Sequence, residues 1–131
     1  MTNSLKALVD PQSVAVVGAS ADVTRIGGRV LDYLIRGGFK GPLIPVNPNR
    51  SEVQGLAAAP SIDALPSPVD AAILAVGAEA TPAAVEACAA RGVKGCVIFS
   101  AGFAETGAEG RALENRLQEI AARTGIRLIG P

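Results

Sequence analysis

The segment GASADVTRIGG, residues 18–28, has the residue types of a phosphate-binding turn between an apolar run and a helical pattern. Gly18 permits a tight turn, and Ser20 supplies a hydroxyl donor. Gly27 and Gly28 stand where the helix is expected to begin, so backbone N–H groups can approach an anion at the positive end of the helix dipole. The segment therefore predicts a phosphate cradle, although its glycines could instead serve only close packing of the helix on the strand.

The segment PVNPNR, residues 45–50, indicates which phosphate compound would suit this cradle. NAD-binding proteins place an acidic residue at the end of the second strand, where it accepts hydrogen bonds from the ribose hydroxyls. Here Asn47 stands at that place, and Arg50 follows it. A missing carboxylate and an added cation disfavour NAD and favour a nucleotide with an extra ribose phosphate, which is coenzyme A or NADP. Pro48 could add a flat edge for an adenine, but a simple turn with a solvated arginine is an equal alternative.

Two later loops, GAEAT (77–81) and SAGFAET (100–106), hold few reactive groups. Ser100 has no base near it in the sequence. The chain contains no histidine, which is the commonest general base and the commonest metal ligand. The small residues of the later loop suit contact with a thin polar ligand or a carboxylate. We therefore expect binding residues but no catalytic residue and no metal site in this chain.

Apolar runs alternate with helical patterns along the chain. Unbroken apolar runs of this length suit parallel strands that are covered on both faces. The runs are residues 13–19, 42–47, 70–77, 94–102 and 126–131, and the main helical patterns are residues 28–38, 81–92 and 106–125. The alternation predicts an α/β fold, a doubly wound, Rossmann-like parallel sheet of five strands in the order 3-2-1-4-5.

Two local expectations follow from this fold class. In an open parallel sheet, ligands bind at the carboxyl ends of the strands where the strand order reverses, here between the first strand and the strand at 70–76. Residues 51–68 contain three prolines, so we expect an irregular segment with only a short helix near Ile62–Leu65.

Composition excludes several classes of function. Twelve basic and twelve acidic residues are scattered without a basic stripe, which disfavours nucleic-acid binding. No apolar run reaches membrane-spanning length, and the first residues lack the apolar core of a signal peptide. We expect a cytoplasmic domain without membrane contact. The two cysteines, Cys88 and Cys96, are interpreted as small buried hydrophobic residues rather than as a disulfide or a metal site.

Four segments occur in an order that is specific as a combination: DPQSVAVVGAS, GGRVLDYLIRGGFKGPLIPVNPNRSEVQG, PSPVDAAILAVGAEA and GVKGCVIFSAGFAETGAEG. With the terminal LIGP, they resemble the N-terminal CoA-binding domain of the NDP-forming acyl-CoA synthetases, a superfamily that includes the α subunit of succinyl-CoA synthetase. The resemblance extends from about Leu8 to Pro131. It favours CoA over NADP as the ligand.

The resemblance implies contacts to each part of CoA. By position, the phosphates would be held by Gly18, Ala19, Ser20, Gly27 and Gly28. The adenosine would lie against Val46, Asn47 and Pro48, and its phosphate would bind Arg50. The pantetheine arm would follow Val76, Gly77 and Ala78, and the thiol and acyl group would lie near Ser100, Ala101 and Gly102.

The resemblance also implies a division of labour with other domains. Family enzymes join an acid to CoA through an acyl phosphate and a phosphorylated histidine, with ADP or GDP as the other product. Residues 1–131 would be one CoA-binding domain at the start of a longer chain. ATP, ADP and Mg²⁺ would bind only to later ligase or ATP-grasp domains or subunits, and a homo-oligomer is possible. The alternatives are an NADP-binding oxidoreductase domain and a CoA-sensing regulatory module, as in some protein acetyltransferases.

Overall fold

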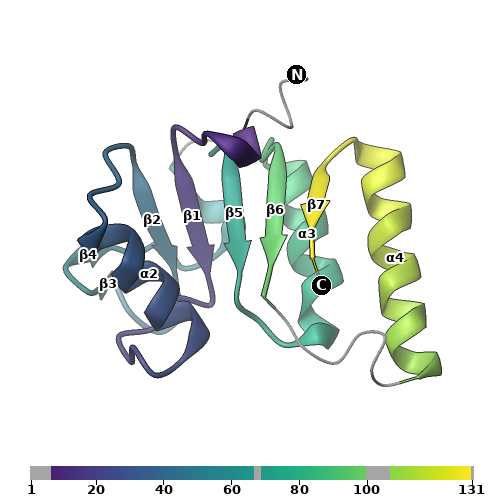
Figure 1. Cartoon of the computed structure of the whole chain (residues 1–131), viewed down its shortest axis with the longest axis horizontal. Coiled ribbons are helices and arrows are strands. Elements are labelled where there is room, and N and C mark those ends of the chain that lie inside the picture. Colours follow the sequence, from purple (N-terminus) through teal and green to yellow (C-terminus); the bar gives the residue numbers. More distant parts are fainter. Residues whose placement is uncertain (1–6, 67–68, 100–106, 131) are drawn as a thin grey trace.

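A parallel sheet of five strands forms the centre of the computed structural model, which describes residues 7–66, 69–99 and 107–130 (Figure 1). Its strands are β1 (Val14–Val17), β2 (Leu43–Val46), β5 (Ala71–Leu74), β6 (Gly95–Ile98) and β7 (Arg127–Ile129). They lie in the order β2-β1-β5-β6-β7, and every neighbouring pair is parallel. Each strand falls within one of the predicted apolar runs, so the five strands are confirmed.

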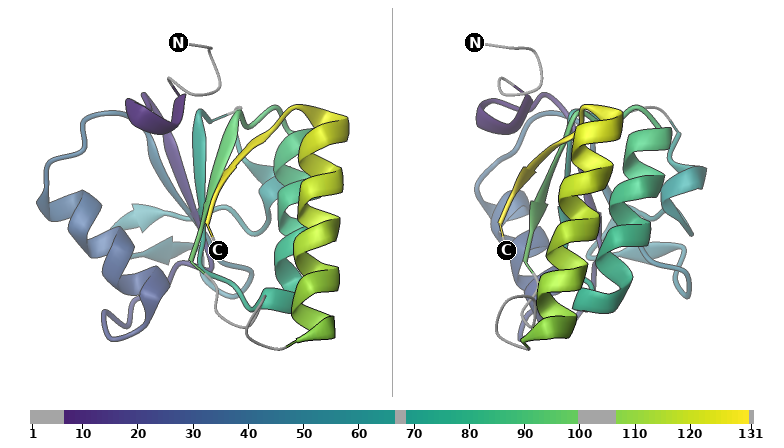
Figure 2. Two further views of the ribbon diagram at one scale, coloured as in Figure 1. Left: turned by 45° about the vertical axis from the view of Figure 1, so that its right-hand side comes forward. Right: turned by 90° about the vertical axis from the view of Figure 1, so that its right-hand side faces the viewer.

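Helices cover both faces of the sheet. They are α2 (Ile26–Arg36), α3 (Thr81–Ala90) and α4 (Ala108–Thr124), with short 3-10 helices η1 (Ile62–Ala64) and η2 (Ala78–Ala80). Helix α2 lies on one face, and α3 and α4 lie on the other (Figure 2).

Side chains of β1 alternate between two buried clusters because successive strand residues point to opposite faces. Val14 and Val16 pack in the cluster that contains Leu31 of α2. Ala15 and Val17 belong to the larger cluster, which includes residues of α3 and α4. The doubly wound, Rossmann-like class is therefore confirmed.

The position of the third sheet strand differs from the prediction. Counted along the chain, the sheet strands lie in the order 2-1-3-4-5, so the predicted order 3-2-1-4-5 is wrong. Strand β5 pairs with β1 over its full length, and in the part of the chain that the structure describes the place outside β2 holds a single parallel bridge between Val46 and Ala59. Pro60 follows Ala59 and has no N–H to extend the bridge. The reversal point nevertheless lies between β1 and β5, as predicted.

A small hairpin occupies part of the segment that was predicted to be irregular. Strands β3 (Glu52–Val53) and β4 (Leu56–Ala57) are antiparallel, joined by Gln54 and Gly55. Both turn residues have positive φ, 51° and 85°, which is typical of a type I′ turn. Val53 is buried in the same cluster as Leu31 of α2, so the hairpin is anchored on that side of the sheet. The short helix predicted near residues 62–65 is present as η1.

The two cysteines lie in α3 and β6, where both are buried and free, as interpreted from the sequence. A hydrogen bond with the Cys88 thiol and burial raise the pKa of Cys96, so this thiol remains protonated and unreactive. Among the described residues, no helix has the length and apolar character needed to cross a lipid bilayer.

Candidate functional site

Strand register brings three predicted site segments to one edge of the sheet. Val17 at the end of β1 pairs with Val46 of β2 on one side and with Leu74 of β5 on the other. The chain beyond each of these residues therefore leaves the sheet at the same edge. This edge holds the turn at 18–28, the segment at 47–50 and the loop at 75–78. It is the carboxyl edge, where open parallel sheets bind their ligands.

The turn at 18–28 is shaped by close contacts of its own backbone. Gly18 has a φ of 84°, which side chains rarely tolerate, and a Cβ atom there would overlap the carbonyl oxygen of Ala75. A Cβ on Gly27 would overlap the Gly18 carbonyl oxygen, and one on Gly28 would overlap the Asp22 carbonyl oxygen. These contacts require glycine whether or not a ligand binds. The packing alternative therefore explains the glycines, which by themselves do not indicate phosphate.

Backbone N–H groups of the first turn of α2 are the stronger indication of an anion site. The helical hydrogen-bond ladder begins with the Arg29 N–H, which donates to the Arg25 carbonyl oxygen at 2.8 Å. In the described part of the chain, the N–H groups of Ile26, Gly27 and Gly28 have no acceptor. No side chain caps this helix end. An acceptor from outside the chain can therefore pair with this helix start, where Ile26 is exposed and Gly27 and Gly28 are buried.

Asn47 connects the second segment to the turn. Its Nδ2 donates to the Ala19 carbonyl oxygen at 3.0 Å, and its Oδ1 accepts from the Asn49 N–H at 2.8 Å. An aspartate could still accept from Asn49 but could not donate to Ala19. These two hydrogen bonds explain why position 47 is asparagine, and the comparison with NAD-binding proteins did not reveal them.

Arg50 lies between two attachments of its segment to the turn. Asn47 is bonded to Ala19, and the Gln54 side chain donates to the carbonyl oxygens of Ser20 and Gly28. The intervening residues must therefore pass beside the turn. Arg50 is exposed, and within the described ranges its guanidinium has no ion-pair or hydrogen-bond partner. It is a cation available to an anion at this edge.

Asp22 adds a negative charge to the turn, but its carboxylate is occupied locally. Its Oδ1 accepts from the Thr24 hydroxyl at 2.6 Å and from the Thr24 N–H at 2.9 Å, and Arg25 lies 3.9 Å from its Oδ2. The Thr24 hydroxyl hydrogen bond, followed by the Thr24 N–H bond, lowers the pKa of Asp22 below its usual value. The carboxylate is therefore ionised near neutral pH and holds the turn together.

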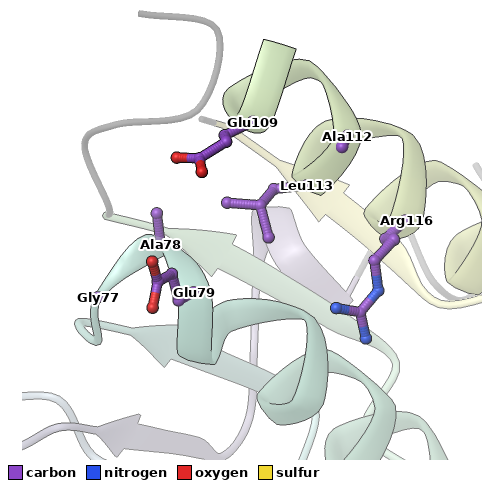
Figure 3. Close-up of a pocket in the computed structure, with 7 residues that line it drawn as sticks. All are labelled: Gly77, Ala78, Glu79, Glu109, Ala112, Leu113 and Arg116. Atoms are coloured by element: carbon purple, nitrogen blue, oxygen red, sulfur yellow. The ribbon is translucent and has the colours of Figure 1, made fainter. Parts of the chain in front are cut away.

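A cleft of about 610 Å³ opens beside the third segment, between η2 and the first half of α4 (Figure 3). It is lined by Gly77, Ala78, Glu79, Glu109, Ala112, Leu113 and Arg116. The carboxylates of Glu79 and Glu109 lie at one end, Arg116 lies at the other, and Leu113 projects between them. No residue of the turn at 18–28 lines this cleft. It therefore adjoins the predicted site without being the phosphate cradle.

The predicted site residues divide into those that the structure brings together and those that it does not describe. Twelve of them belong to the carboxyl edge or to the segments that leave it: Gly18, Ala19, Ser20, Gly27, Gly28, Val46, Asn47, Pro48, Arg50, Val76, Gly77 and Ala78. Ser100, Ala101 and Gly102 lie outside the described residues. Sequence reasoning assigned no role to Gln54 or to the α4 side of the cleft, although Gln54 and Glu109 lie in segments that carry the resemblance, because their contacts depend on tertiary packing.

The chain matches proteins of one family over nearly its full length. The sequence pattern of a CoA-binding domain matches residues 12–131. The ADP-forming acetate–CoA ligase II of Archaeoglobus fulgidus is 45% identical over 127 residues, which cover 97% of this chain and 19% of the ligase. The α subunit of the ADP-forming acetate–CoA ligase I of Pyrococcus furiosus is 39% identical over 132 residues, covering 98% of this chain and 29% of that subunit.

A solved structure extends the match to the fold. The dinucleotide-forming acetyl-coenzyme A synthetase 1 of Candidatus Korarchaeum cryptofilum, solved with phosphate and ADP, superposes with a TM-score of 0.92 at 37% identity. The alignment covers 99% of this chain and 28% of that one.

A doubly wound sheet with an uncapped helix start at its carboxyl edge is typical of Rossmann-like nucleotide-binding domains. This chain belongs to the CoA-binding domain family, as the resemblance predicted. It spans less than a third of the length of these curated relatives.

Proposed function

We propose that this chain is the CoA-holding domain of an NDP-forming acyl-CoA ligase. Family membership supports CoA as the ligand, and the names of the relatives supply the ligase reaction. The observation in the structure that carries the proposal is that, among the described residues, three N–H groups at the start of α2 and the guanidinium of Arg50, at the same edge of the sheet, have no partner. NADP remains the ligand to exclude by experiment, since it too carries an extra ribose phosphate.

The diphosphate of CoA binds at the turn in this proposal. The N–H groups of Ile26, Gly27 and Gly28 donate to its oxygens, and the helix dipole adds a partial positive charge. Ala19 and Ser20 form the opposite side of the turn. The glycines act indirectly, because they allow the close backbone contacts that give the turn its shape.

The adenosine end lies over the segment from Val46 to Pro48, and Arg50 binds the phosphate on the ribose. An exposed arginine without a partner in the described part of the chain can turn toward this phosphate without breaking an existing ion pair. Its planar guanidinium suits a two-point contact with phosphate oxygens. This contact distinguishes CoA from dephospho-CoA.

The pantetheine arm follows Val76, Gly77 and Ala78 toward residues 100–102. Gly77 is exposed, and a Cβ there would meet no atom within 4 Å, so the loop leaves room for an extended chain. The cleft between η2 and α4 continues from this loop. Three of its lining residues, Ala78, Ala112 and Leu113, are apolar and suit the uncharged part of the arm.

The remaining chemistry belongs to other domains or subunits in this proposal. The chain has no histidine to phosphorylate. ATP, ADP and Mg²⁺ therefore act elsewhere, and residues 1–131 form one domain that presents the CoA thiol to them. We propose a cytoplasmic location, where these nucleotides occur.

Calorimetric titration of the chain with CoA, NADP and NAD at one fixed salt concentration tests this function. The proposal predicts binding of CoA, with NADP and NAD at least about tenfold weaker, equivalent to about 1.4 kcal/mol. A preference for NADP, or no binding of CoA, would contradict it.

A further inference from the structure

Gln54 has an unusual backbone for its residue type. It is the only non-glycine residue with positive φ, at 51°, among the described residues. Two-residue hairpin turns with this geometry favour asparagine, aspartate or glycine, whereas a long unbranched side chain gains nothing from the turn itself. The side chain must therefore be explained by what it reaches.

The Gln54 amide nitrogen bridges the two ends of the turn. Its Nε2 donates to the Ser20 carbonyl oxygen at 2.8 Å and to the Gly28 carbonyl oxygen at 2.9 Å. One acceptor lies at the beginning of the turn and the other lies in the first turn of α2. Both bonds are partly buried, so water competes weakly for these carbonyls. A single side chain thus fixes the distance between the two ends.

The bridge also orients the N–H groups around it. A trans peptide unit is planar, so its N–H points opposite to its carbonyl oxygen. When the Ser20 carbonyl faces Gln54, the Ala21 N–H faces away from it. The Gly28 carbonyl belongs to the same peptide unit as the Arg29 N–H, which closes the first helical turn on Arg25, so holding this carbonyl holds the turn in which the N–H groups of Ile26, Gly27 and Gly28 lie. These are the groups that would meet a phosphate.

We propose that Gln54 is a positioning residue that holds the turn at 18–28 in its phosphate-binding shape. The inference rests on the proposed binding of CoA at this turn. Gln54 does not touch the ligand in this account. It lowers the cost of binding because the turn is already ordered before the anion arrives.

Two substitutions separate the side-chain bridge from the backbone conformation. Gln54→Asn favours the positive φ but is one methylene too short to reach both carbonyls. Gln54→Met keeps the length but has no donor. Gln118→Asn, at an exposed position on α4, is the matched control for the same chemical change.

The measurements are CoA affinity by calorimetry, thermal unfolding, and amide hydrogen exchange without ligand. We expect both Gln54 variants to bind CoA about tenfold more weakly, since two hydrogen bonds to the turn are lost. Exchange at the Arg25 and Arg29 N–H groups, whose hydrogen bonds lie in the turn and the first helical turn, should become about tenfold faster. Both variants should also unfold at a lower temperature, because two partly buried carbonyl oxygens lose their donor, and Gln54→Asn should lose less than Gln54→Met because asparagine suits the hairpin turn. Because the bridge is absent from both variants, their CoA affinities should fall equally. Affinity losses that follow the two unfolding temperatures would indicate a purely structural residue.

Each outcome decides between the two claims. Unchanged affinity in both variants, with CoA bound by the original chain, would overturn the role of Gln54 and leave the proposed function intact. Unchanged amide exchange would overturn the bridge itself, whatever the affinity. Failure of the original chain to bind CoA would overturn the proposed function, and the positioning role would fall with it.

Discussion

Replacing Arg50 with methionine should separate CoA from dephospho-CoA. Methionine keeps a long unbranched side chain but removes the charge. Because Arg50 is exposed and has no partner among the described residues, its loss should leave the fold unchanged. The substitution should weaken the binding of CoA, which carries the ribose phosphate, and leave the affinity for dephospho-CoA, which lacks it, unchanged.

The magnitude follows from the setting of the side chain. An exposed ion pair contributes about 0.2–1 kcal/mol, and a charge-assisted hydrogen bond about 1.5–3 kcal/mol. A two-point contact at a partly open surface should lie between them, at about 1–2 kcal/mol. That corresponds to a loss of CoA affinity of about 5- to 30-fold. The loss should shrink in 1 M salt, where the screening length falls to about 3 Å.

Calorimetric titration of both ligands into both proteins gives a double-mutant cycle between Arg50 and the phosphate. Lys40→Met is the control, because it removes one positive charge before β2, at the opposite edge of the sheet. It should change CoA affinity by less than about twofold. Equal losses for CoA and dephospho-CoA in the Arg50 variant would refute the assignment of Arg50 to the ribose phosphate.

Three further predictions concern the turn and the residues beside it. Gly27→Ala should lower the free energy of unfolding by about 2–3 kcal/mol in chemical denaturation, because the added Cβ overlaps a backbone carbonyl. In the same assay Gly77→Ala should be neutral or stabilising by about 0.5 kcal/mol, because the site is open and its φ is −60°. The Asp22 carboxyl should titrate below the ordinary value of about 3.9 in an NMR pH series, and Thr24→Val should raise its pKa toward that value. Because folding favours the ionised carboxylate, its contribution to stability is present above the unfolded pKa and is lost as the pH falls through the lowered pKa of the folded state. Asn47→Asp should reduce the free energy of unfolding by about 1 kcal/mol because the donor to the turn is lost, and unchanged stability would count against that hydrogen bond.

Local sequence patterns were sufficient for the strands and the class of fold. The run from Val14 to Val17 is apolar throughout because both faces of β1 are covered, and the same reason makes the other central strands recognisable. Gly37 directly follows α2, and Gly125, with a φ of 81°, ends α4, as these residues commonly do. These features depend on neighbours along the chain, so the sequence alone can indicate them.

Features that depend on distant contacts were not predictable in the same way. The strand order was wrong because the chain after Ala59 crosses to the far side of β1 rather than extending the sheet beyond β2. The role of Gln54 was missed because its acceptors, Ser20 and Gly28, lie 34 and 26 residues away in the sequence. Gly27 was recognised as part of the site, but its contact with the Gly18 carbonyl required coordinates.

The central claim is that CoA binds across the carboxyl edge of the sheet, with its phosphates at the start of α2. Mapping backbone amide NMR shifts while CoA is added tests this most directly. We predict the largest shifts at residues 19–28, with further shifts at residues 47–50 and 76–78. The opposite edge, including Lys40, should stay unchanged. No shift at residues 19–28, or shifts concentrated at the opposite edge, would contradict the account.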